Sequence, residues 1–116
     1  MENQALECHI AVMLRLIGVQ PNVRGWRYII TAVELAAAEL VHAVTKELYP
    51  AVAAKHETTP SRVERCIRSA IEYAWTYGSQ DAQQHYFGAV VSPEKGKPTN
   101  AAFIAGLADW ARGAAI

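Results

Sequence analysis

The sequence has few of the residues that build disulfide, metal or catalytic sites. Its 116 residues include only two cysteines, Cys8 and Cys66, which lie far apart in helical patterns. We therefore expect no disulfide framework and favour the reducing environment of the cytoplasm. The four histidines are scattered, without an H-x-x-x-H or C-x-x-C spacing that would indicate a metal site. Glycine-rich phosphate loops and Ser-His or Cys-His motifs are also missing, so the sequence predicts neither an enzyme nor a cofactor.

Long apolar runs and an excess of charge are absent as well. The apolar runs are too short to span a membrane, and the acidic start MENQALECHI does not have the form of a secretion signal. Eleven Lys and Arg residues balance eleven Asp and Glu residues. Nucleic-acid-binding proteins are typically basic, so any DNA binding must depend on local clustering of charge. Hydrophobic residues make up 52% of the chain, which argues against a disordered protein, and the length predicts one domain over residues 1–116.

Apolar residues recur with helical spacing, and the only strand-like run, GAVV, is too short to build a sheet. The second apolar segment is broadly apolar, which predicts a central helix buried on more than one side. Pro50 should kink or split the third segment. Ser79 and Thr99 are N-cap candidates for the last two helices, and Trp110 is expected to face inward. The predicted fold class is all-α with about six helices, at residues 4–18, 24–40, 41–55, 60–78, 80–87 and 100–112.

The stretch TTPSRVERCIRSAIEYAWTYG, residues 58–78, combines a helix start signal with a face of arginines. Thr59 can cap the first turn, Pro60 suits the first helical position, and Gly78 can end the helix in a left-handed conformation. The apolar residues form one stripe: Val63, Ile67, Ala70, Ile71 and Ala74. The other side carries Arg62, Arg65, Arg68 and Ser69. Guanidinium groups in this arrangement can bind guanine edges or phosphates in a major groove, although an ordinary solvated helix has a similar composition.

A helix, a short polar turn without glycine and the arginine-bearing helix form a helix-turn-helix pattern. Three segments give a more specific indication: LIGVQPNVRGWRYI, TKELYPAVAAKHETTPSRVERCIRSAIEYAW and KGKPTNAAFIAGLAD. In order and spacing they resemble the DNA-binding effector domain of the stage zero sporulation protein A family of response regulators. The resemblance covers about residues 6–111. It implies a six-helix domain containing a helix-turn-helix, with a positioning helix at about residues 45–56 and a recognition helix at about residues 60–78.

The resemblance also implies sequence-specific binding of double-stranded DNA at promoter boxes similar to TGTCGAA, often in tandem. On the matching residues it implies arginine contacts to base edges and nearby phosphates, with Glu64 accepting from a cytosine. An intrahelical pair between Glu64 and Arg68 is the alternative for those two side chains. The family commonly has His where this chain has Ser69, so this residue bears on box preference. The candidate DNA contacts of the helix are Ser61, Arg62, Glu64, Arg65, Arg68 and Ser69.

Two further surfaces follow from the sequence and the resemblance. Lys95 and Lys97 precede the Thr99 cap, and with the start of the last helix they could clamp a phosphate or remain ordinary loop lysines. Residues 78–91 match the segment that in the family contacts the RNA polymerase sigma subunit. Tandem boxes imply self-association on DNA. In this segment three side chains replace smaller ones that are typical of the family, and they bear on activation of transcription: Gln83, Gln84 and His85.

Members of the family carry an N-terminal phosphoacceptor receiver domain, which these 116 residues do not include. The chain is either an isolated effector domain or a natural receiver-less relative that its own phosphorylation cannot switch. A receiver-less relative could bind DNA constitutively, or compete with a full-length regulator. The alternative from another functional class is a helical protein-interaction module with weak DNA binding. Arg62, Arg65 and Arg68 discriminate between these functions, since exposed and unpaired arginines favour DNA binding and buried ion pairs favour the module.

Overall fold

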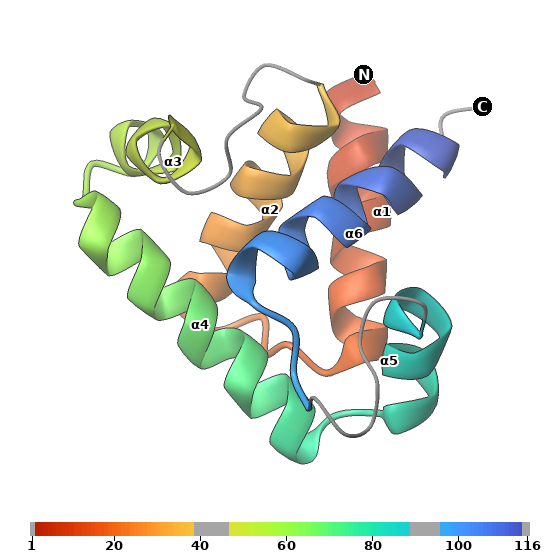
Figure 1. Cartoon of the computed structure of the whole chain (residues 1–116). Helices are drawn as coiled ribbons and strands as arrows, with labels where there is room; N and C mark the ends of the chain where they lie inside the picture. The colour runs from red at the N-terminus through yellow and green to blue at the C-terminus, as the bar shows by residue number, and fades with distance from the viewer. Residues whose placement is uncertain (1, 39–46, 89–95, 115–116) are drawn as a thin grey trace.

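A computed structural model of the chain describes residues 2–38, 47–88 and 96–114. All regular structure in these ranges is helical, so the predicted all-α fold class is confirmed. The N-terminal end of α1 and the C-terminal end of α6 lie at the same side of the domain (Figure 1). The described ranges contain six helices: α1 (Glu2–Ile17), α2 (Arg24–Ala37), α3 (Tyr49–Lys55), α4 (Pro60–Tyr77), α5 (Gln80–Phe87) and α6 (Asn100–Ala114).

Helix α2 lies at the centre of the domain, as its broad apolar distribution predicts. It packs against α1, α3, α4 and α6, and in Figure 1 α6 crosses over α2 and α1. Ile29, Ala32 and Val33 of α2 are fully buried. They belong to one continuous core, whose other members include Ile10, Met13, Leu14, Ile67, Phe103 and Leu107. This core holds α4 along one side, and most of the opposite side of α4 is exposed.

The C-terminal ends of α1 and α4 meet at a pair of glycines. Gly18 ends α1 with a φ of 114°, a left-handed conformation that other residues rarely adopt. Gly78 ends α4 as predicted, but its φ is −87°, so the predicted left-handed ending is wrong. Glycine is needed at this position for a steric reason instead, because a Cβ atom would overlap the carbonyl oxygens of Ile17 and Ala74. The close approach fixes the far end of α4 against α1.

Gln83 of α5 closes the same junction with hydrogen bonds. Its side-chain amide donates to the carbonyl oxygen of Ala74 at 2.8 Å and to that of Ile17 at 3.2 Å. The residue is only 7% exposed. Gln83 therefore links α1, α4 and α5 from inside the domain.

Helix boundaries follow the predicted capping where the signal is local. The hydroxyl of Ser79 accepts from the backbone N–H of Ala82 at 3.2 Å, and α5 begins at the next residue. The hydroxyl of Thr99 accepts from the N–H of Ala102 at 3.1 Å at the start of α6. The predicted end of the second helix at residue 40 is wrong, since α2 ends at Ala37. No breaker marks that end in the sequence.

The predicted segment at residues 41–55 is described only from residue 47 onward. Here α3 begins at Tyr49, and Pro50 lies in its first turn. Residues 47 and 48, directly before α3, are already helical, in a π-type turn, so helical backbone continues on both sides of Pro50. The helical turn changes from π-type to α-type beside Pro50, as expected for the predicted kink, and the part of the predicted positioning helix before residue 47 lies outside the described ranges.

Trp110 does not face inward as predicted, because 40% of it is exposed. Ala108 and Ala111 take the buried positions at this end of α6. Trp110 lies instead against α5, where its indole N–H donates to the carbonyl oxygen of Tyr86 at 3.2 Å. The rings of Tyr86 and His85 lie 5.1 and 5.2 Å from its ring centroid. The result is an aromatic cluster at the surface between α5 and α6.

Candidate nucleic-acid interface

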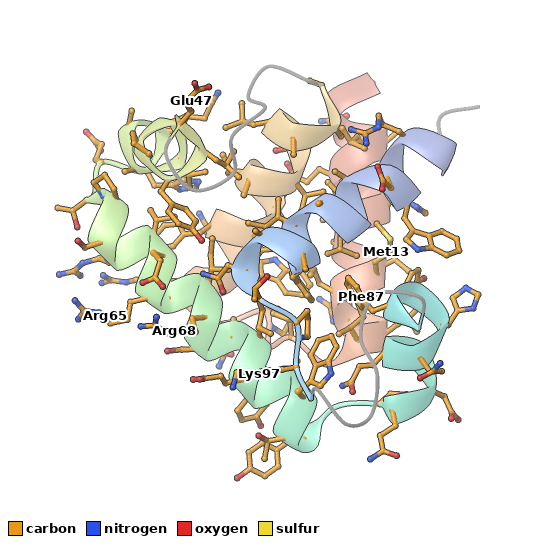
Figure 2. The ribbon with its side chains drawn as sticks, in the orientation of Figure 1. Met13, Glu47, Arg65, Arg68, Phe87 and Lys97 are labelled. Atoms are coloured by element: carbon orange, nitrogen blue, oxygen red, sulfur yellow. The ribbon has the colours of Figure 1, made fainter. Side chains whose placement is uncertain are left out.

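Helix α4 has one face in the core and the other in solvent. The hydroxyl of Thr59 accepts from the N–H of Arg62 at 3.2 Å, so the helix begins where its cap predicts. The predicted apolar stripe is buried: Val63, Ile67, Ala70, Ile71 and Ala74. Five predicted contact residues on the other face are exposed: Ser61, Arg62, Arg65, Arg68 and Ser69. Figure 2 shows Arg65 and Arg68 pointing away from the body of the domain.

The arginines of this face differ in their partners. The Nη1 atom of Arg68 lies 2.7 Å from Oε1 of Glu64, one turn earlier in α4. Their side chains are 53% and 34% exposed, so water screens the pair and its contribution to stability is about 0–1 kcal/mol. Arg62 and Arg65 form no ion pair with any residue in the three described ranges. Two guanidinium groups are thus open to a ligand, and the third is held by a pair that a ligand can replace.

Lys97 lies beside the second half of α4. Its Nζ atom is 3.5 Å from Oε2 of Glu72, and both side chains are about half exposed, at 46% and 50%. The ammonium group is therefore drawn toward the outer surface of α4, close to the capped start of α6 at Thr99. Lys95, the other predicted phosphate contact, lies outside the described residues.

Asn100, the first residue of α6, joins three helices behind the arginine face. Its side-chain amide donates to the hydroxyl of Tyr49 in α3 at 3.0 Å and to the carbonyl oxygen of Glu64 in α4 at 3.1 Å. Burial raises the pKa of Tyr49, while the hydrogen bond from Asn100 acts in the opposite direction. The hydroxyl therefore stays protonated at neutral pH. These contacts fix α4 relative to α3 and were not predicted from the sequence.

The turn between α3 and α4 is held by side chains of α2. The hydroxyl of Thr31 lies 2.7 Å from Nε2 of His56, and the ring of Tyr28 meets the imidazole edge-on at a centroid distance of 5.1 Å. Glu57 takes a left-handed conformation, with a φ of 54°. A residue other than glycine adopts this conformation only when its surroundings support it. The contacts of His56 supply that support, which explains how this turn forms without glycine.

The sequence matches the family model described as sporulation initiation factor Spo0A C terminal over residues 10–110. This range contains α2 to α5 completely, together with the second half of α1 and most of α6.

The chain belongs to the Spo0A C-terminal family. The resemblance inferred from the three sequence segments is thereby confirmed. The family is one of DNA-binding effector domains of a sporulation regulator and not a family of enzymes. Double-stranded DNA is accordingly its partner. The exposed arginines of α4 lie in the matched range, as do Asn100 and the turn at His56.

Other predicted features of this Spo0A C-terminal domain have mixed outcomes. Within residues 78–91, the part up to residue 88 is described and consists mainly of α5. Gln84 and His85 are exposed, whereas Gln83 is buried and has the structural role given above. Among the side chains that the structure describes, no group of three or more metal-binding residues occurs. None of the described helices is long and apolar enough to span a membrane.

Sequence reasoning overlooked two arginines that border α4. Arg24 and Arg27 belong to the first turn of α2 and are exposed. They line a hollow together with Arg62 at the start of α4. The missed signal is the segment VRGWRY, in which two arginines follow one another at helical spacing within the matched region.

Proposed function

We propose that residues 1–116 act as a single effector domain in which α4 enters the major groove of DNA and α3 positions it. One observation carries the proposal: α4 presents Arg62, Arg65 and Arg68 to solvent, while its opposite face is fixed in the core. A helix anchored in this way can enter a groove without repacking the domain. The exposed state of the three arginines also counts against a protein-interaction module that has lost DNA binding.

The proposed targets are boxes similar to TGTCGAA. Such a box holds three guanines, two on the written strand and one opposite its cytosine, and each can accept a forked contact from arginine at O6 and N7. From Arg62 to Arg68, α4 rises about 9 Å. The three guanines span three base steps, or about 10 Å along one strand. The lengths agree, which supports one arginine for each guanine, with Ser61 and Ser69 as contacts at the edges.

Glu64 has a role of its own in this proposal. In the free protein its carboxylate holds Arg68 at 2.7 Å. Near DNA, Arg68 would turn to a guanine or a phosphate, and Glu64 would accept a hydrogen bond from a cytosine amine. Breaking the pair between Glu64 and Arg68 costs little free energy, because an exposed ion pair of this type contributes only about 0–1 kcal/mol.

Phosphate contacts would flank the base contacts. We assign them to Lys95 and Lys97, which precede α6, and to the N–H groups at the start of α6. The contact of Lys97 with Glu72 supports this role, since it draws the ammonium group toward the outer side of α4. Truncation of Lys97 to alanine should weaken binding to all duplexes by a similar factor.

Two protein contacts belong to the same proposal. Residues 78–91 would contact the RNA polymerase sigma subunit, and two copies of the domain on tandem boxes would touch one another and gain affinity through effective concentration. The exposed aromatic cluster of His85 and Trp110 supports the first contact, with ring centroids 5.2 Å apart. Substitution of His85 by alanine should lower transcription from a boxed promoter and leave DNA affinity unchanged. A two-box duplex should bind the second copy more tightly than the first.

A fluorescence-anisotropy titration at two salt concentrations tests the central claim. The probes are a duplex with two TGTCGAA boxes and a scrambled duplex, and the proteins are wild type, Arg65→Ala and Arg112→Ala. Arg112→Ala is the charge control: it removes one positive charge from the last turn of α6, where Arg112 pairs with Asp109 and donates to the carbonyl oxygen of Ala36. We expect box preference in the wild type and in Arg112→Ala, and its loss in Arg65→Ala. Equal, weak and salt-sensitive binding to both duplexes would refute sequence-specific reading and favour a search for a protein partner.

A further inference from the structure

A hollow of about 530 Å³ lies where the start of α2 meets the start of α4. We call it the arginine hollow. Residues of α2, of the α3–α4 turn and of the first turn of α4 line it: Arg24, Arg27, Tyr28, His56, Glu57, Thr58, Thr59 and Arg62. It therefore opens at the end of α4 where the exposed arginine face begins.

The charge of the arginine hollow is positive. Arg24, Arg27 and Arg62 contribute three guanidinium groups, against the single carboxylate of Glu57. None of the three arginines forms an ion pair within residues 2–38, 47–88 and 96–114. All three are exposed, so no burial penalty compels them to find a partner inside the protein. The chain as a whole has no net charge, so the positive charge of the hollow is a local concentration of arginines and not a general property of the surface.

Close packing of α2 against α4 holds the three arginines together. Gly25 follows Arg24 directly, and a Cβ atom on it would lie 2.5 Å from the carbonyl oxygen of Cys66 and 2.8 Å from the Cβ atom of Ala70. Only glycine allows the two backbones to approach this closely. The hydrogen bond between Thr31 and His56 fixes the third wall of the hollow, the α3–α4 turn. The arginines are thus carried by rigid elements and not by a loop.

We propose that Arg24 and Arg27 of the arginine hollow bind a backbone phosphate of the DNA duplex at the edge of the major groove that α4 occupies, while Arg62 at the rim of the hollow keeps its guanine contact. Arginine suits this role because its planar fork of N–H donors matches two phosphate oxygens. The capped start of α4 adds the partial positive charge of an 18-residue helix at the same place. This contact rests on the proposed function for its orientation, and it adds affinity that does not depend on base sequence.

The contact has a measurable salt signature. Each neutralised phosphate adds about 0.9 to the slope of log K against log salt concentration. A fourfold rise in salt concentration lowers the affinity for DNA in every variant. In a variant that lacks one phosphate contact, this loss of affinity should be about 3.5-fold smaller than in the wild type. Base contacts lack this signature, since they alter the preference between duplexes.

The test is an anisotropy titration with Arg27→Ala, Arg24→Ala and the control Arg112→Ala. The duplexes carry one box or a scrambled sequence, so self-association on tandem sites does not contribute. We expect Arg27→Ala to weaken both duplexes by the same factor, about tenfold at low salt, and to lower the salt slope by about one. Arg112→Ala should leave affinity and slope close to wild type, and circular dichroism should show that all variants fold.

The outcomes separate this inference from the proposed function. The wild type could prefer the box while Arg24→Ala and Arg27→Ala keep the affinity and the salt slope of the wild type. This result would overturn the phosphate contact at the arginine hollow and leave the proposed function in place. A change in box preference in these variants would also overturn it, because that result indicates a base contact. Absence of box preference in the wild type would refute the proposed function. In that case a lower salt slope for Arg27→Ala on the scrambled duplex would still support a phosphate contact, and an unchanged slope would reject it.

Discussion

Replacement of Gln83 by leucine tests whether hydrogen bonds or packing hold α1, α4 and α5 together. Leucine fills a similar volume, so the cavity left behind is small. The carbonyl oxygen of Ala74 keeps its bond from the N–H of Gly78 at 2.7 Å. The carbonyl oxygen of Ile17 loses the amide donor at 3.2 Å and has no other backbone or side-chain donor in the described ranges. A buried carbonyl without a partner costs about 1–3 kcal/mol, so we expect the free energy of unfolding to fall by about 2 kcal/mol.

Thermal unfolding followed by circular dichroism measures this loss. For a chain of 116 residues the entropy of unfolding corresponds to about 4 °C per kcal/mol, so Tm should fall by about 8 °C. Gln83→Glu should be less stable still at neutral pH, because its carboxylate faces two carbonyl oxygens, and acid should reduce the difference. Gln84→Leu is the matched control on the exposed side of α5, with an expected change within about 0.5 kcal/mol. A Gln83→Leu variant that unfolds at the wild-type temperature would refute the assigned role of the amide.

Three further predictions concern α4 and α2. Thr59→Ala should lower the free energy of unfolding by about 1 kcal/mol through loss of the helix cap, and Thr59→Ser should restore it in the same unfolding assay. Glu64→Gln should release Arg68 and tighten binding to a scrambled duplex by about two- to fivefold in anisotropy, while box preference falls; weaker binding to that duplex would contradict the exchange proposed for this pair. Burial raises the pKa of Glu34, the nearby carboxylate of Glu7 raises it further, and Lys55 acts in the opposite direction. The folded protein then binds this proton more tightly than the unfolded chain, so ionisation of Glu34 costs stability as pH rises through its pKa. Glu34→Gln should raise Tm at neutral pH, with a smaller gain near pH 4; equal gains at both pH values would show that the carboxylate is not the cause.

The predictable features of the fold depend on short stretches of sequence. A hydroxyl three residues before a free backbone N–H sets the start of α4, α5 and α6, and that spacing is visible at Thr59, Ser79 and Thr99. The buried stripe of α4 follows from helical periodicity. The exposed arginine face is the complement of that stripe, so the same pattern predicted it. These features need no knowledge of how the helices pack.

The features that the sequence could not predict depend on contacts between distant parts of the chain. Gln83 is buried because it reaches carbonyl oxygens of α1 and α4, and Asn100 is fixed by partners 51 and 36 residues away. Arg24 comes to lie beside the hollow that Arg62 also lines only because α2 packs against α4. Trp110 has helical spacing with the buried residues of α6, but smaller alanines take the inward positions there. The spacing of apolar residues along one helix does not determine which side of that helix another helix will bury.

The division of α4 into a buried stripe and an exposed arginine face has a consequence for how such domains diversify. Val63, Ile67 and Ile71 are fixed by the core, whereas Arg65 and Ser69 are exposed. If α4 reads DNA as proposed, changes on the outer face would alter which DNA is chosen at little cost in stability. Under the proposed function, promoter choice and folding would then vary independently within one helix, and single substitutions could give a lineage new target genes while the scaffold stays the same.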